Sequence, residues 1–228
     1  MKTSRRIHKI AEMCHGARRV IDVGCDHAQL CAYLVAECGV EKAFASDLRE
    51  GPLENAKRTV SALGLSDKIE TILCNGLEAF GPDQADTIVI AGMGGDEIAA
   101  ILERAVWPLE GKHTLILQPM TAAERLRKWL EDHCCGILEE QFIEDGGKFY
   151  AVLRVKGKNA GSDAQKYAYL FSEKALSDPL FPQYLHKLKL KYHKIAEGQK
   201  KAGLAETPEQ NALKILSSLV ETEGSSCR

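Results

Sequence analysis

The chain has 228 residues, of which 45% are hydrophobic, and a formal net charge of −2 at neutral pH. This length can bury one substantial core with a small appendage, and the charge gives no overall sign of nucleic-acid binding. The sequence lacks an apolar leader and any stretch near the ~20 apolar residues of a membrane span. These features predict a cytoplasmic protein and exclude a membrane-spanning helix.

The eight cysteines show no C-x-x-C spacing, and several lie inside apolar runs, where cysteine acts as a small hydrophobe. This usage is typical of a protein in a reducing compartment. Cys25, His27 and Cys31 are close enough in sequence to suggest a metal site. A structural zinc site, however, needs a fourth ligand and usually paired knuckles, so we expect no metal.

Two segments are basic although the chain as a whole is slightly acidic. The first 19 residues contain six basic side chains, Arg6 among them, against one acidic side chain, and residues 183–202 contain six lysines against one glutamate. Such segments are compatible with contact to a polyanion, although a solvated helix face explains them equally well. The candidate contacts in the second segment are Lys187, Lys191 and Lys194.

From residue 20 to residue 155, short apolar runs alternate with stretches of helical periodicity. The expected strands are residues 20–23, 43–46, 69–73, 87–91 and 114–117. The expected helices between them are residues 28–38, 51–63, 96–105 and 122–133. This alternation predicts a parallel sheet with right-handed crossovers, and the continuous apolar runs indicate strands that are buried on both faces.

The turn after the first expected strand indicates a nucleotide site. Asp22 and Gly24 end this strand, and the next strand ends in Asp47 followed by Leu48. A tight glycine turn at a helix start, followed by an acid one strand later, is how α/β proteins hold a ribose. The second glycine of the dinucleotide fingerprint is missing, so the turn suits an adenosine ligand without a pyrophosphate, of which S-adenosylmethionine is the common one. Gly24 would then meet its methionine part, Asp22 would orient the loop or reach the ammonium, and Asp47 would accept both ribose hydroxyls.

Two further motifs follow strands that end at the same edge of the sheet. Asn75 and Gly76 come after the third strand, where an amide can read an adenine edge, although Asn-Gly is also an ordinary turn. The fourth strand is followed by Gly92, Met93, Gly94 and Gly95. We expect Gly92 at the cofactor and the other three at the substrate, because glycines allow a close approach to the backbone. Asp96 is expected to cap the following helix.

The last two expected strands differ from the others. Residues 137–143 and 149–155 are joined by only five residues, a connection too short for a crossover, so these strands must pair antiparallel. A parallel sheet that ends in an antiparallel hairpin is the methyltransferase variant of the Rossmann-like fold rather than the dehydrogenase one. Gln118 and Pro119, which follow the fifth strand, are expected at the rim of the site.

The chain divides into two parts at the polar linker 156–162. Residues 1–157 form the expected cofactor-binding domain, and residues 158–228 form a small helical domain. The helices expected in this domain are residues 163–177, 182–202 and 207–220, of which at least two run antiparallel. Thr207, Pro208 and Gln210 make a strong helix start, with a cap, a proline at the first position and a glutamine at the third.

Several of these motifs occur together in one known family. The first is the block Asp22-Val23-Gly24-Cys25-Asp26-His27-Ala28, and the second is Ala91-Gly92-Met93-Gly94-Gly95 with its preceding strand from Asp86. Shorter matches are Ser4-x-Arg6-Ile7, Gly51-Pro52, Asn75-Gly76-Leu77 and Leu117-Gln118-Pro119. With these motifs, which cover most of residues 4–155, the chain resembles the bacterial tRNA adenine-22 N1-methyltransferases. The tail resembles their coiled-coil-like C-terminal domain more loosely.

The resemblance implies S-adenosylmethionine as the methyl donor and N1 of an adenine in the tRNA D-arm as the acceptor. We expect no metal, and no obligatory protein partner is evident from the sequence. The chain departs from the family pattern at Cys25, Gln29 and Cys31, where serine, tyrosine and proline are usual. Asp47 replaces a frequent glutamate and keeps the carboxylate.

The implied chemistry assigns roles to the side chains at the turn. Adenine N1 attacks through an in-plane lone pair and needs no prior deprotonation, so alignment and stabilisation of the developing cation matter more than base catalysis. We expect Asp26 to be the nearby carboxylate and His27 to be a supporting or proton-accepting partner, although His27 could equally make a structural hydrogen bond. The target nucleotide must leave its stack, and Arg6 and the tail lysines would hold tRNA phosphates.

Three other functions are compatible with parts of the pattern. A methyltransferase acting on a small molecule or on another RNA site would share the cofactor turn. A nicotinamide-dependent oxidoreductase would share the fold, although the missing second glycine argues against it. A non-catalytic RNA-binding protein with a relic cofactor pocket would need neither Asp47 nor Asp26.

Overall fold

The computed structural model describes residues 3–158 and 164–225, and within this part the strands form one seven-stranded sheet in the order β3-β2-β1-β4-β5-β7-β6. The strands are β1 Arg19–Val23, β2 Lys42–Asp47, β3 Ile69–Leu73, β4 Thr87–Gly94, β5 Thr114–Thr121, β6 Gly136–Asp145 and β7 Lys148–Lys156. The α-helices are α1 Arg5–Met13, α2 Gln29–Glu37, α3 Glu50–Ala62, α4 Gly95–Arg104, α5 Ala123–Asp132, α6 Phe181–Lys201 and α7 Pro208–Ser225.

The first five strands of this sheet are parallel, and β7 and β6 close it as an antiparallel hairpin. β1 pairs in parallel with both β2 and β4, and β4 pairs in parallel with β5. β7 then runs antiparallel to β5 and to β6. The predicted parallel sheet with a terminal hairpin is therefore confirmed.

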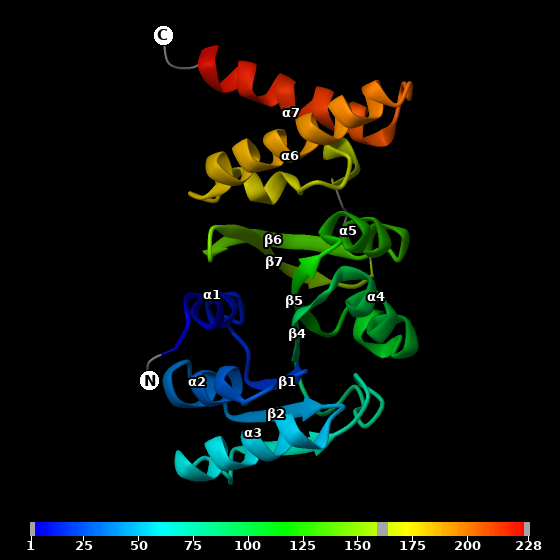
Figure 1. Cartoon of the computed structure of the whole chain (residues 1–228). Helices are drawn as coiled ribbons and strands as arrows, with labels where there is room; N and C mark the ends of the chain where they lie inside the picture. The colour runs from blue at the N-terminus through cyan, green and yellow to red at the C-terminus, as the bar shows by residue number, and fades with distance from the viewer. Residues whose placement is uncertain (1–2, 159–163, 226–228) are drawn as a thin grey trace.

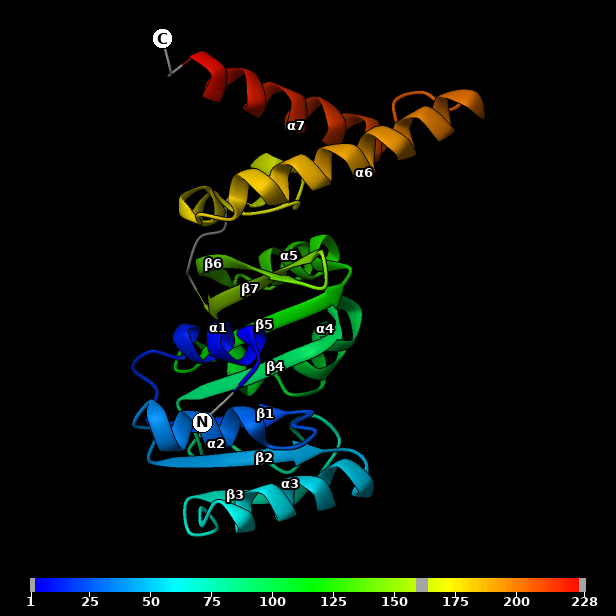
Figure 2. The ribbon, with the colours of Figure 1, turned by 60° about the vertical axis from the view of Figure 1, so that its left-hand side comes forward.

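Helices cover both faces of the sheet. α1, α2 and α3 lie on one face, whose apolar layer includes Val20, Ala43 and Val89. α4 and α5 lie on the other face, over residues such as Ile21 and Ile88. Alternate residues of each strand thus enter opposite cores, which explains the uninterrupted apolar runs in the sequence. α6 and α7 pack together beyond the β6–β7 end of the sheet, and α3 and β3 lie at the opposite end (Figures 1 and 2).

Two details of the sheet and its helices differ from the sequence prediction. β4 continues through the glycine motif to Gly94, with register shifts against β5, because the extended backbone at Met93 and Gly94 still finds partners on Pro119 and Thr121. The structure also contains α1, which we did not predict. Ser4 caps this helix by accepting a hydrogen bond from the backbone N–H of Ile7, so a cap signal was present in the sequence.

The expected helix 163–177 is wrong, although its first residue lies outside the described part of the chain. The segment forms only two short 3₁₀ turns, Ala164–Tyr167 and Glu173–Ser177. Both Ala168 and Tyr169 adopt positive φ, which breaks the helix, while Phe171 is fully buried against the sheet. Tertiary burial of closely spaced apolar residues has overridden local helical periodicity. Part of the linker 156–162 also lies outside the described residues.

The helical tail shares a core with the sheet. Phe171, Phe181 and Leu185 belong to the same buried apolar cluster as the strand residues on the α4–α5 face. The expected start of α7 is confirmed, because Thr207 Oγ1 accepts from the N–H of Gln210 and the Gln210 side chain accepts from the N–H of Thr207. The domain boundary between residues 157 and 158 stays a prediction. The side chains of the two parts pack in one apolar core.

A buried ion pair between α5 and β6 also binds the backbone of the first part of the tail. Arg127 of α5 and Glu140 of β6 are 1% and 0% exposed, and the Arg127 Nη2 to Glu140 Oε1 distance is 2.5 Å. Glu140 Oε2 also accepts from the N–H of Ser172, and Arg127 Nη1 donates to the carbonyl of Tyr169. Both charged side chains therefore also bond to the backbone of the segment 164–177, and they fix its path across the sheet.

Replacing either partner of this pair should destabilise the protein strongly, because the other charge stays buried and unpaired. We expect Arg127→Met or Glu140→Gln to lower the free energy of unfolding by about 3–5 kcal/mol in denaturant titrations. The double variant Arg127→Met/Glu140→Met should recover much of that loss. Lys128→Met, which breaks an exposed pair on the same helix, is the matched control and should have little effect. Single variants as stable as this control would contradict the assignment.

Candidate active site

A cleft of about 590 Å³ opens where β1, β2 and β4 end. Parallel strands place their carboxyl ends at one edge of a sheet, and ligands bind there when neighbouring crossovers leave in opposite directions. β1 lies between β2 and β4, so the helices that follow β1 and β4 leave to opposite faces at this point. A smaller cavity of about 140 Å³ adjoins the cleft and shares Arg6, Gly24, Asp26, Ala91 and Gly92 with it.

The turn after β1 forms the wall between the two cavities. Gly24 has φ of +74°, and the backbone N–H groups of Gly24 and Cys25 both donate to the carbonyl of Ser46 at the end of β2. Asp26 and Ala28 also have positive φ, at 46° and 52°. Non-glycine residues in this region are strained, and such strain is concentrated at functional sites. The turn is therefore held in one shape before any ligand arrives.

Met93 packs directly on this turn. A Cβ atom on Gly24 would lie 2.3 Å from Met93 Cε, so the end of the methionine side chain would have to move, and the φ of +74° is what favours glycine here. Met93 itself lines the larger cleft. The glycine of the first motif and the methionine of the second are therefore in contact at the cleft.

Asp22 is a buried carboxyl group at the smaller cavity. It is 5% exposed, and the Cys31 Sγ lies 3.7 Å from its Oδ2 as a weak hydrogen-bond donor. In the described part of the chain, no ion pair includes Asp22. Burial is the main cause that raises the pKa of Asp22 to about 7, and the negative charge of Asp47 adds to the effect. A cationic ligand group in this cavity would reverse that shift.

Asp47 and Leu48 line the larger cleft, at the end of β2. Asp47 is 6% exposed, and its Oδ1 accepts a 2.9 Å hydrogen bond from the backbone N–H of Arg49. This bond holds the carboxylate at the cleft, where its other oxygen can accept from a ligand. Leu48 is 65% exposed and presents an apolar surface beside it. Such a side chain suits the face of an adenine.

Asn75 and Gly76 line the same cleft after β3. The Asn75 amide donates to Glu78 at 2.7 Å, and its carbonyl oxygen lies 3.4 Å from Arg104 Nη2. Gly76 is buried with φ of +60°, and its Cα packs near Ile101 of α4. Asn75 is therefore oriented by two charged neighbours before it meets a ligand.

Asp26 and His27 lie side by side at the smaller cavity. Their side chains are 69% and 47% exposed, and the His27 Nε2 to Asp26 Oδ2 distance is 3.7 Å. Arg6 of α1 lines both cavities and faces the same turn. An open carboxylate next to an imidazole and a guanidinium can orient a polar base and stabilise positive charge that develops on it.

The glycine motif of β4 divides between the cleft and the protein interior. Gly92 lines both cavities, and its N–H donates to the side-chain oxygen of Gln118 at 3.1 Å. Gln118 is fully buried, so the expectation of a rim contact is wrong: it supports Gly92 from beneath. Gly94 and Gly95 do not line the cleft. A Cβ on Gly95 would lie 2.4 Å from the carbonyl oxygen of Ala122, so this glycine permits close packing of two helix starts.

Asp96 does not cap α4, in contrast to our expectation. The helix begins at Gly95, with Gly94 at the cap position and no side-chain cap. Asp96 lies one residue too late and instead forms a two-bond pair with Arg125 of α5, with distances of 2.8 and 2.5 Å. This pair joins the two helix starts that Gly95 brings together.

The three candidate lysines lie on α6, away from the cofactor turn. Lys187 and Lys191 line a separate hollow between α6 and the β5–β7 edge, and Lys194 is exposed one turn further along the helix. The structure therefore brings the Asp22, Asp47 and Asp26 groups together and leaves the lysines as a separate surface on the same molecule.

Comparison with known proteins identifies this arrangement. A family model described as "Methyltransferase domain" matches residues 3–153. The tRNA (adenine(22)-N(1))-methyltransferase of Bacillus subtilis is 39% identical over 153 residues, which cover 67% of this chain and 64% of that protein. The crystal structure of the B. subtilis M1A22 tRNA methyltransferase TrmK has a TM-score of 0.75 at 33% identity and covers 96% of both chains. The chain belongs to the tRNA (m1A22) methyltransferase family.

Another member of this family extends the likeness to the whole chain. The structure of Streptococcus pneumoniae Sp1610, a putative tRNA (m1A22) methyltransferase, has a TM-score of 0.80 at 34% identity and covers 95% of this chain and 99% of that one. A structure of the same protein in complex with S-adenosyl-L-methionine has a TM-score of 0.79. The likeness includes the helical tail, so the tail belongs to the family architecture.

The family site contains residues that the sequence motifs did not reveal. The larger cleft is also lined by Arg49, which directly precedes α3, and by Glu97 and Arg104, which are seven residues apart on one face of α4. None of the three stands in one of the motifs, so the motifs did not reveal them. No metal-binding group of three or more His, Cys, Asp or Glu residues is found among the described residues. Within the same part of the chain, no helix is long and apolar enough to cross a membrane.

The buried Asp22 carboxyl should make the stability of the free protein depend on pH. Between its ordinary pKa of 3.8 and its folded value of about 7, the unfolded chain releases this proton while the folded protein keeps it. Raising the pH across this window therefore favours the unfolded chain and lowers stability, with no further loss above it.

Thermal unfolding of the unliganded protein and of Asp22→Asn at pH 5 and pH 8 tests this. The wild-type protein should lose stability relative to the variant as the pH rises, because the variant has no proton to release. Titrating groups that do not interact with Asp22 cancel in the comparison. An equal pH dependence of the two proteins would show that Asp22 titrates normally.

Proposed function

We propose that this chain transfers a methyl group from S-adenosylmethionine to N1 of adenine 22 in the tRNA D-arm. The observation that supports this best is that Asp22, Asp47 and Gly92 line two adjoining cavities, with Asp26 and His27 at the smaller one. A cofactor and a base could both reach this turn. The names of the family members in the comparison give the substrate.

The residues of the cleft fit S-adenosylmethionine. Its parts need an acid for the ammonium group, an acid for the ribose diol and an apolar surface for the adenine. Asp22 is a buried carboxyl group without an ion-pair partner in the described chain, and Asp47 is fixed at the mouth by the N–H of Arg49. Leu48 and Asn75 lie beyond Asp47. Bound there, S-adenosylmethionine supplies a sulfonium-activated methyl group.

The side chains next to this methyl position would align the target base. Adenine N1 attacks through its in-plane lone pair, and the product base carries a positive charge. The exposed Asp26 carboxylate stabilises that charge, and His27 holds Asp26 or accepts a proton later. Arg6 sits at the mouth of both cavities, where it can hold the phosphate of the extruded nucleotide. We place this activity in the cytoplasm, where tRNA is processed.

The cofactor assignment predicts a selective loss in the variant Asp47→Asn. We expect it to bind S-adenosylhomocysteine about 10- to 100-fold more weakly in calorimetry, because hydrogen bonds to a charged acceptor contribute more than neutral ones. Glu70→Gln, which changes an exposed acid on β3 that lines neither cavity, is the matched control. The wild-type protein should be protected against heat by S-adenosylhomocysteine and not by NAD. Protection by NAD alone would point to an oxidoreductase.

The activity itself is tested with labelled S-adenosylmethionine and unmodified tRNA transcripts, followed by mapping of the modified base. We expect label at N1 of adenine 22, and replacement of that adenine by guanine should abolish incorporation. Asp26→Asn should lower kcat more than it changes the affinity for S-adenosylhomocysteine. Label at another base, or only on a small molecule, would replace this proposal with one of the other methyltransferase functions.

The tail lysines are expected to hold tRNA by charge. The triple variant Lys187→Glu/Lys191→Glu/Lys194→Glu should weaken tRNA binding and reduce the slope of log K against log salt by about 2–3, since each phosphate contact contributes just under one. Reversal of Lys42 on β2, Lys57 on α3 and Lys68 just before β3, at the other end of the sheet, is the matched control. A salt slope that is the same in both triple variants would exclude α6 as a tRNA contact.

A further inference from the structure

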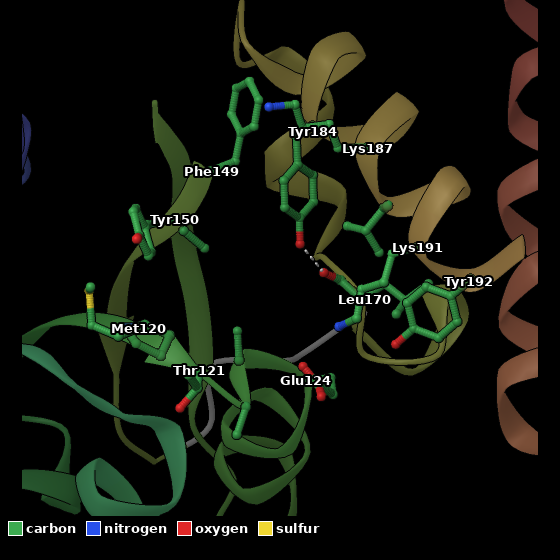
Figure 3. Close-up of a pocket in the computed structure, with 15 residues that line it drawn as sticks. Met120, Thr121, Glu124, Phe149, Tyr150, Leu170, Tyr184, Lys187, Lys191 and Tyr192 are labelled. Carbon is green, nitrogen blue, oxygen red and sulfur yellow. Dashed lines mark hydrogen bonds between the residues drawn. The ribbon is translucent and has the colours of Figure 1, made fainter. Parts of the chain in front are cut away.

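A hollow of about 230 Å³ lies where the end of β5, the start of β7 and the helix α6 meet (Figure 3). We call it the interdomain pocket. Its floor is the stretch from Pro119 to Glu124, and its walls are Phe149 and Tyr150 on one side and Tyr184 to Tyr192 of α6 on the other. It is separate from the cofactor cleft and from the residues that we assign to methyl transfer.

Aromatic rings from two elements surround this pocket. Phe149 and Tyr150 are half-buried on β7, and Tyr184 faces them from α6 (Figure 3). The Tyr184 ring stacks on Phe142 at 4.1 Å, and its hydroxyl donates to the carbonyl of Leu170. Tyr184 is therefore a rigid wall. Phe149 and Tyr150 keep part of their ring surface open to the hollow.

The pocket is connected to the active site through one contact. Arg6 lines both cavities of the cofactor site, and its Nη1 lies 3.7 Å from the Sδ of Met120. Met120 is in turn part of the pocket floor. Strand residues alternate, so Tyr150 is on the α1 side of β7 with Met120, and Phe149 is on the α6 side. The interdomain pocket thus lies between α6 and the end of β5, and Met120 connects it to Arg6 at the active site.

The outer rim of the pocket is positively charged. Lys187 and Lys191 are exposed one helical turn apart, and the Lys187 Nζ lies 5.0 Å from the Phe149 ring centre. Lys187 also donates to the carbonyl of Gly147, a bond that an incoming phosphate oxygen can replace. Glu124 is the one acidic residue that lines the pocket, and its carboxylate can accept a hydrogen bond from the exocyclic amine of a base. Rings inside and lysines outside match a base and its phosphate.

We propose that the interdomain pocket binds one unpaired nucleotide of the substrate RNA, the neighbour of the adenine that is methylated. This rests on the proposed function. Extruding one base removes the stacking partner of the next, and a nearby aromatic site compensates for that loss. The base lies against Phe149 on the α6 side, Tyr150 closes the pocket on the α1 side, and the phosphate meets Lys187 and Lys191. The pocket thereby holds the strand open while the adenine occupies the active site.

Kinetics with paired variants test the stacking role. Tyr150→Leu and Phe149→Leu keep apolar bulk and remove the ring, so each should raise KM for tRNA about fivefold or more. The ring-preserving variants Tyr150→Phe and Phe149→Tyr should restore KM to near the wild-type value. Binding of S-adenosylhomocysteine, measured by calorimetry, should not change in any of the four, which shows that the fold and the cofactor site are intact.

Photo-crosslinking locates the nucleotide directly. Full-length protein with S-adenosylhomocysteine is irradiated with tRNA transcripts that contain 5-iodouridine at one position each around adenine 22. We expect the strongest crosslink from a position next to that adenine, on the peptide that contains Phe149 and Tyr150. Crosslinks from these positions only to other peptides would overturn the proposal.

The outcomes separate this inference from the function on which it rests. If the wild-type protein fails to methylate tRNA, the proposed function fails. If it methylates tRNA while the leucine variants keep the wild-type KM, the function stands and the nucleotide pocket is wrong. Competition of the RNA crosslink by an unrelated basic or acidic peptide, with tRNA kinetics unchanged in the variants, would mark the hollow as a protein-docking site instead.

Discussion

The parallel pairing of β1 with both β2 and β4 is the constraint on which the site depends. It places Asp22 and Gly24 between Asp47 and Gly92, and it lets the helices after β1 and β4 leave to opposite faces. Because the backbone bonds of three strands fix these ends, the carboxylates need no long side chains to reach one ligand. The strand order fixes where the cleft lies, and the side chains at the strand ends then decide what it can bind.

Packing then makes the cleft rigid. Met93 seats on Gly24, and Gln118 supports the Gly92 backbone from a fully buried position. The strained turn at Asp26 is held between these contacts. On the far side of the sheet, the Arg127–Glu140 pair fixes the segment that leads to α6. The helical tail therefore has a defined position relative to the active site.

Much of the fold could be predicted from the sequence, because strand burial and short connections leave a direct pattern. Continuous apolar runs identified the parallel strands, and the five-residue connection after residue 143 required the hairpin. The helix predicted at 163–177 failed because Phe171 and its neighbours are buried by the sheet, and Ser172 donates to Glu140. Burial against residues distant in the sequence outweighs the local helical periodicity, and such burial cannot be predicted from the local sequence.

The sequence by itself determined the chemistry at the carboxyl ends of the strands. Asp22, Gly24 and Asp47 follow apolar runs directly, so their side of the sheet was fixed once those runs were strands. Tertiary structure alone decided which motif residues reach the cleft. Gly92 lines it, while Gly95 faces Ala122 and Gln118 lies beneath. It also created the interdomain pocket, whose walls come from β5, β7 and α6. Residues that meet only through long-range packing share no spacing, so only the folded chain reveals them.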